Sequence, residues 1–255
     1  MIPKDEIKDF LEFKVNEFNK PEFIELDPIS VPHRFSSKED IEISAFLTAT
    51  ISWGNRKAIL GASDQMMQMM GESPYDFIMN LNENNYDKIS KFYYRTFNST
   101  DFVYFLKAIK NIYSKHNGLE ALFNELTSKF SIQESISEFR NIFFELPHPT
   151  RTEKHVSDPI NGSAAKRINM MLRWLIRNDN NGVDFGIWNK ISPSKLSIPL
   201  DVHSGNTARK LGLLSRKQND AKAVKELDIV LRSFDPLDPV KYDFALFGLG
   251  VIEKF

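Results

Sequence analysis

The 255-residue sequence contains no cysteine. This excludes disulfide bonds, thiolate zinc sites, cysteine nucleophiles and cysteine-ligated iron–sulfur clusters. The sequence also lacks any apolar run near the roughly 18 residues that a membrane-spanning helix needs. Residues 1–19 alternate charged and apolar positions, without the continuous apolar stretch of a signal peptide. We therefore expect a cytoplasmic protein with no membrane partner.

Net charge is almost absent as well, because 33 Lys and Arg residues face 34 Asp and Glu residues, a formal charge of −1. The charges are nevertheless unevenly distributed. Residues 1–150 carry a net charge of −6, residues 151–217 of +7, and residues 218–255 of −2. Such asymmetry indicates a localised electrostatic surface, here a candidate anion-binding segment at 151–217.

Residues that favour strands are scarce, with ten Val and eight Thr in the chain. Apolar residues instead recur at intervals of three and four, as in the stripe Phe102, Phe105, Leu106 and Ile109. Capping-box patterns at 36–39 and 131–134 and an Asp-Pro pair at 238–239 mark helix starts. The sequence predicts an all-α protein: one helical unit over 1–255, or two lobes, an acidic one at 1–150 and a basic one at 151–255.

Residues 163–177 are predicted to form a helix with one basic side. At 100° per residue, Arg173 and Arg177 fall about 20° to either side of Lys166, opposite Leu175 and its apolar neighbours. A solvated basic face explains this spacing. A helix that follows the phosphates of a nucleic acid is the alternative, and the spacing alone does not decide between them.

Asp201 follows the apolar residues 198–200 and precedes a polar helix that ends in Arg209 and Lys210. This position predicts an N-cap, in which the carboxylate accepts hydrogen bonds from free backbone amides. His203 and Asp201 are residue types that bind metal ions, but the sequence has no second cluster with ligand spacing. We expect no metal and no cofactor.

Two resemblances add to this interpretation. The Leu-Asp-Val-His segment at 200–203, with the Arg-bearing helix and Leu-Gly-Leu after it, resembles the helix-hairpin-helix DNA glycosylases, the superfamily of endonuclease III and the archaeal 8-oxoguanine glycosylases. Residues 43–53 resemble an early helix of that fold. More closely, the chain resembles the bacterial domain of unknown function 2400 family, over residues 45–57, 163–177, 184–212 and 235–250.

The superfamily resemblance implies a helix-hairpin-helix glycosylase fold and a lysine nucleophile opposite an aspartate. Asp201 matches the aspartate, and Lys166, which follows the turn 159–162, is our candidate for the lysine. The lysine would attack the sugar of a flipped nucleotide, which requires it to lose its proton; Arg167 and Arg173 nearby would favour that loss. The pair is separated by 35 residues, so the assignment requires both side chains to face one site.

The same resemblance implies damaged double-stranded DNA as partner, with 8-oxoguanine as the candidate lesion. The expected DNA-binding residues are Arg167, Arg173, Arg177, His203, Arg209 and Lys210. Trp53, Trp174 and Trp188 are candidates for stacking on the extruded base, although tryptophans at helical spacing also serve as core residues. Two alternatives stay open: a catalytically inactive nucleic-acid-binding protein of the same fold, and a helical protein-interaction module. Oligomeric state is not predicted.

Overall fold

The computed structural model describes residues 3–82 and 85–255 and confirms the all-α prediction. Among these residues the only paired strands are β1 (Tyr93–Tyr94) and β2 (Phe97–Asn98), which form a short antiparallel hairpin. No helix in the described part of the chain is both long and apolar enough to cross a membrane.

The chain folds into two units. The first contains residues up to Glu25, Ser131–Glu134 and Asp158–Phe255, and the second contains Leu26–Phe130 and Ser135–Ser157. These units differ from the lobes expected from charge chiefly at the N-terminus, which groups with the C-terminal part of the chain.

The second unit is built around a cluster of aromatic side chains. Phe46 of helix α2 (Lys38–Ile51) stacks on Phe105 and meets Phe139 and Phe143 edge-on, with ring centroids 5.4–5.8 Å apart. Nearly the whole of α2 is buried. The helices of the second unit are α2, α3 (Arg56–Met69), α4 (Pro74–Met79), α5 (Tyr86–Ile89), α6 (Ser99–His116), α7 (Leu119–Lys129) and α8 (Ile132–Phe143). The first residues of α8 belong to the segment that is grouped with the first unit. Short 3-10 turns lie at Pro28–Ser30, Pro32–Arg34 and Thr150–His155.

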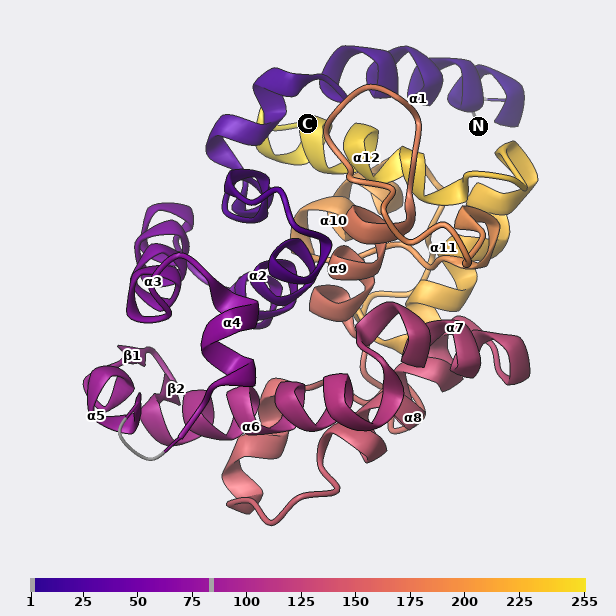
Figure 1. The fold of residues 1–255 in the computed structure, drawn as a ribbon. Helices are drawn as coiled ribbons and strands as arrows, with labels where there is room; N and C mark the ends of the chain where they lie inside the picture. Colours follow the sequence, from indigo (N-terminus) through magenta and orange to yellow (C-terminus); the bar gives the residue numbers. More distant parts are fainter. Residues whose placement is uncertain (1–2, 83–84) are drawn as a thin grey trace. The chain divides into compact units, whose positions relative to one another are not determined.

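The first unit is centred on the C-terminal helix α12 (Tyr242–Val251), which is apolar on nearly all sides. Helix α1 (Lys4–Phe18) runs along it, as Figure 1 shows, and α10 (Val202–Lys210) also packs on it. The close approach of α10 depends on Gly250, where a Cβ would lie 3.1 Å from the His203 carbonyl oxygen. The other helices are α9 (Lys166–Ile176) and α11 (Ala221–Phe234), with 3-10 turns at Pro21–Leu26, Pro193–Lys195 and Pro239–Lys241.

Most of the expected helix starts are capped as local chemistry predicts. Ser131 exchanges hydrogen bonds with Glu134 at the start of α8, as the box at 131–134 predicts. Helix α2 is capped one residue later than the predicted box at 36–39, by Ser37, whose hydroxyl oxygen accepts from the Asp40 amide. Asp238 is the exception. It precedes the short 3-10 turn at 239–241 without a side-chain cap, because its carboxylate binds Arg177 instead.

Candidate active site

The chain enters helix α9 through a tight, left-handed turn. The Gly162 amide donates to the Pro159 carbonyl at 2.9 Å, and the Asp158 carboxylate accepts from two amides inside the turn. Gly162 has φ +94°, and Ala165, directly before Lys166, has φ +45°. A left-handed conformation costs a residue with a Cβ roughly 1–2 kcal/mol. Backbone strain of this kind is concentrated at functional sites in proteins.

The structure brings Lys166 and Asp201 together. Lys166 is the first residue of α9, and Asp201 is the N-cap of α10. The Lys166 Nζ lies 3.8 Å from the Asp201 Oδ2, and the two side chains are 30% and 17% exposed. An amine and a carboxylate from the ends of two different helices therefore share one site that solvent reaches.

The two oxygens of Asp201 have different partners. Its Oδ1 accepts from the Ser204 amide at 2.9 Å and from the Ser204 hydroxyl at 3.1 Å, while its own amide donates to that hydroxyl. These bonds form a capping box that fixes the carboxylate at the helix start. Its Oδ2 faces Lys166. The predicted N-cap is thus confirmed, and the cap orients the carboxylate toward the lysine.

Asp243 is a third charged group at this site. It lies in the first turn of the apolar helix α12, is 6% exposed, and accepts a short hydrogen bond from Arg173. Burial raises the pKa of Asp243 to about 6, against the effect of Arg173, and the negative charge of Asp201 raises it further. Asp243 was not among the predicted site residues, although a charged residue within an otherwise apolar helix indicates a functional or paired position.

Arg173 and Arg177 do not lie on a solvated basic face, so this interpretation of their spacing is wrong for both. Both are buried, at 3% and 2% exposed, as is every residue from 168 to 176. Asp184 lies between them, 3.3 Å from Arg173 Nε and 3.1 Å from Arg177 Nη1. Arg177 also pairs with Asp179 and Asp238, at 2.6 and 2.9 Å. These guanidinium groups are committed to carboxylates and cannot reach a phosphate in this conformation.

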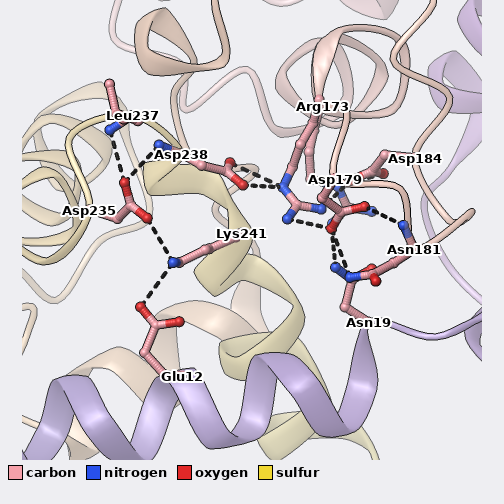
Figure 2. A network of polar contacts seen from close by, with 11 residues as sticks. Glu12, Asn19, Arg173, Asp179, Asn181, Asp184, Asp235, Leu237, Asp238 and Lys241 are labelled. Atoms are coloured by element: carbon pink, nitrogen blue, oxygen red, sulfur yellow. Dashed lines mark hydrogen bonds and ion pairs between the residues drawn. The ribbon is translucent and has the colours of Figure 1, made fainter.

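The polar contacts around Arg177 continue to α1, which they connect to the C-terminal part of the first unit. Figure 2 shows Asn19 beside Asp179, and Lys241 between Asp235 and Glu12 of α1. Lys241 Nζ lies 2.7 Å from Asp235 and 2.9 Å from Glu12. Hydrogen bonds and ion pairs therefore join Asp179 and Lys241 to Asn19, which follows α1, and to Glu12 within it.

The other basic residues expected at DNA are placed differently from Arg173 and Arg177. Arg167 is half-buried next to Lys166, and burial lowers its pKa to about 10, so it remains charged at neutral pH. His203 and Lys210 are exposed on one edge of α10, and Arg209 is half-buried beside them.

Two of the three tryptophans, Trp174 and Trp188, belong to the same unit as Lys166 and Asp201. Trp174 and Trp188 are fully buried in the first unit, so neither ring face is open for stacking in this conformation. Trp53 belongs to the second unit, where it follows α2 and contacts the rings of Tyr94 and His155. It is half-buried, and its carbonyl accepts from the Tyr94 hydroxyl at 2.7 Å.

The site therefore offers one amine and two carboxylates, each at the start of a different helix. Such a set can supply a nucleophile and can stabilise positive charge on a bound molecule. Within residues 3–82 and 85–255, no group of three or more His, Asp or Glu side chains is arranged to hold a metal ion.

Comparison with known proteins gives a single family. No curated protein and no solved structure gives a significant match to the chain. A family model described as "Protein of unknown function (DUF2400)" matches residues 27–252. Because the match covers most of the sequence, including Lys166, Asp201 and Asp243, the chain belongs to the DUF2400 family.

Proposed function

We propose that this protein is a DNA glycosylase and AP lyase of the helix-hairpin-helix type, acting on damaged double-stranded DNA with 8-oxoguanine as the candidate lesion. One observation carries the proposal. A lysine at the first position of one helix lies 3.8 Å from an aspartate that caps another, across 35 residues of sequence. The superfamily resemblance assigns nucleophile and partner carboxylate to these two positions.

In the proposed reaction, the flipped nucleotide presents its C1′ atom to Lys166. The neutral amine donates its electron pair to C1′, while the bond from C1′ to the base breaks and its electron pair leaves with the base, which takes up a proton. The amine then loses a proton, the sugar ring opens with O4′ taking a proton, and a Schiff base remains between Lys166 and C1′.

The two carboxylates have separate roles in this scheme. Asp201 faces the amine, so it can accept the proton that the lysine loses and can stabilise positive charge on the sugar as the base leaves. Asp243 is a positioning residue. It binds Arg173, and its charge acts on both Lys166 and Asp201. Arg173 is neutralised by Asp184 and Asp243, so it adds little positive field near the amine.

A catalytically inactive DNA-binding protein of the same fold is the second candidate. Lys166 and Asp201 within 4 Å form an ion pair in the free protein. A charged lysine in such a pair serves structure and charge balance rather than nucleophilic attack.

Borohydride trapping separates the two candidates. Borohydride reduces a Schiff base to a stable amine, so the proposed reaction leaves protein covalently attached to DNA. We expect wild-type protein to give an adduct with a duplex that contains 8-oxoguanine or an abasic site, and Lys166→Gln to give none. Asp201→Asn should form the adduct about 10²- to 10⁴-fold more slowly, the usual effect of losing a proton-transfer group. Asn is also a good N-cap, so this variant should keep the fold.

Lys222→Gln is the matched control, because Lys222 is an exposed lysine on α11. It should form the adduct at the wild-type rate. If a panel of lesions gives no adduct while salt-sensitive DNA binding persists, the inactive DNA-binding protein replaces the glycosylase. If the protein shows no affinity for DNA even at low salt, both candidates are wrong and an interaction module remains.

A further inference from the structure

A polar pocket lies along the exposed edge of α10, beyond the Lys166–Asp201 pair. Its volume is about 330 Å³, at the lower end of the range for small-ligand sites. His203, Asn206, Arg209 and Lys210 of α10 line it together with Gly250 and Phe255. His203 and Lys210 are seven residues apart, about 10 Å along the helix axis.

The pocket carries uncompensated positive charge. In the described part of the chain, neither Arg209 nor Lys210 lies within 4 Å of a carboxylate, whereas Lys166, Arg173, Arg177 and Arg216 each do. The negative end of the α10 dipole amounts to about half an elementary charge, less than the two cations supply. The Lys210 ammonium lies over the Phe255 ring, 5.6 Å from its centroid, which leaves its charge intact.

Arg209 is held in place by neutral groups. Its Nε donates to the Arg216 carbonyl at 2.7 Å, and its two terminal nitrogens donate to the side-chain oxygens of Asn206 and Asn219. Neutral acceptors orient a guanidinium without cancelling its charge. These contacts use three of the five N–H groups of Arg209, so two remain to donate to an anion such as phosphate.

Asn219 connects the pocket to the candidate active site. Its Nδ2 donates to the Asp201 carbonyl at 2.8 Å, while its Oδ1 accepts from Arg209. This bridge crosses α10 at Gly205, where a Cβ would lie 2.6 Å from the Asn219 Oδ1 and 3.1 Å from the Arg209 Nη1. The helix therefore uses a glycine where the Asn219–Arg209 pair needs space.

A buried hydroxyl at the base of the pocket lacks a partner. Thr207 lines the pocket, and within the described residues its Oγ1 makes no hydrogen bond. Gly250 leaves the space above it open, since a Cβ there would lie 2.9 Å from that oxygen. An unsatisfied buried hydroxyl is costly, so a polar ligand at this place would remove a penalty.

We infer that this pocket binds a phosphodiester group of a DNA strand, with Arg209 and Lys210 as the binding cations and Asn219 as the residue that positions Arg209. The inference rests on the proposed function and adds a specific anchor for the strand, tied through Asn219 to the Asp201 cap. The same side chains would bind a free phosphate ion or a phosphate of the DNA backbone. Binding is therefore measured with two probes, inorganic phosphate and a DNA duplex, to distinguish these ligands.

The first measurement is a titration with inorganic phosphate, in which NMR monitors the chemical shifts of the amides of Gly205, Asn206 and Gly250. We expect saturable shifts in the wild-type protein and in Lys166→Gln, and at least tenfold weaker binding in Lys210→Gln and Arg209→Gln. Lys210 is exposed, so its variant should retain the fold. An absence of saturable shifts in the wild type contradicts the inference.

The second measurement is the salt dependence of binding to a short labelled duplex between about 50 and 200 mM salt. The slope of log K against log salt is negative, and loss of one phosphate contact reduces its magnitude by about 1. We expect this change in Lys210→Gln and Arg209→Gln, and a smaller decrease in Asn219→Ala. Lys222→Gln, with the same change in formal charge, should leave the slope unchanged.

If phosphate binds but the slope does not change, the pocket holds a free ion and the inference about DNA is wrong. The outcome is independent of the catalytic proposal, because the borohydride adduct reports on Lys166 and the slope reports on Arg209 and Lys210. A wild-type adduct with an unchanged slope in Lys210→Gln would contradict the phosphate site alone.

Discussion

At the scale of single residues, burial divides the charged groups of the first unit into two classes. Arg177, with carboxylates of Asp179, Asp184 and Asp238 around it, holds the fold. Lys210 faces solvent and contacts no carboxylate among the described residues. Both are basic positions in the sequence, but their substitution should affect the stability of the fold very differently.

Arg177→Met should lower the free energy of unfolding by about 3–5 kcal/mol, because three carboxylates would lose their buried partner. Lys210→Met, the matched exposed substitution, should change it by less than about 0.5 kcal/mol. Urea unfolding of both variants measures the difference. Equal changes in the two variants would show that the buried network does not stabilise the fold as described.

Asp228 provides a test at another residue. Burial raises its pKa to about 6, although its carboxylate accepts from the Ile198 amide at 2.9 Å. Because the folded state holds this proton more tightly than the unfolded state, the group's contribution to stability falls as pH rises from about 4 to about 6.

Asp228→Asn removes the ionised form and keeps an oxygen for the Ile198 amide. The variant should be more stable than the wild type by about 1–3 kcal/mol at pH 7–8, since one pKa unit corresponds to about 1.4 kcal/mol. The gain should disappear below pH 4. Unfolding at the two pH values measures it, and a gain that is the same at both would contradict the assigned cause.

At the scale of elements, α10 combines a cap, a glycine and a basic edge. An interior helical glycine normally costs roughly 0.5–1 kcal/mol relative to alanine. Gly61 in α3 is such a case, because a Cβ there would meet nothing within 4 Å. Gly205 differs, since a Cβ would press on Asn219 and Arg209.

Gly61→Ala should therefore stabilise the protein by about 0.5–1 kcal/mol, and Gly205→Ala should not. Displacement of Asn219 in Gly205→Ala should also weaken phosphate binding, because Asn219 positions Arg209. Thermal unfolding of both variants provides the comparison. A similar gain in both would mean that the space at Gly205 is not needed.

At the scale of the whole molecule, the features that the sequence predicts correctly are those that depend on residues close together along the chain. The all-α class, the cap at Ser131 and the N-cap at Asp201 all depend on residues within four positions of one another. The pairing of Lys166 with Asp201 needed the superfamily resemblance, because 35 residues separate them.

The errors arose where the partner lies far along the chain. Arg173 bonds Asp243, 70 residues away, and Arg177 bonds Asp238, 61 residues away, so a helical wheel could not show that either is buried. The same holds for α1, whose Glu12 accepts from the Tyr242 hydroxyl across 230 residues. The net charge of +7 over residues 151–217 is thus partly cancelled by acidic side chains of residues 218–255.

The most direct test of the central claim is to locate the attachment site. Wild-type protein trapped by borohydride on a duplex with an abasic site would be digested, and the modified peptide identified by mass spectrometry. The proposed reaction predicts that the nucleotide remnant is attached to Lys166 and that Asp201→Asn carries it at the same residue in lower yield. Attachment at another lysine, or no modified peptide, would contradict the claim.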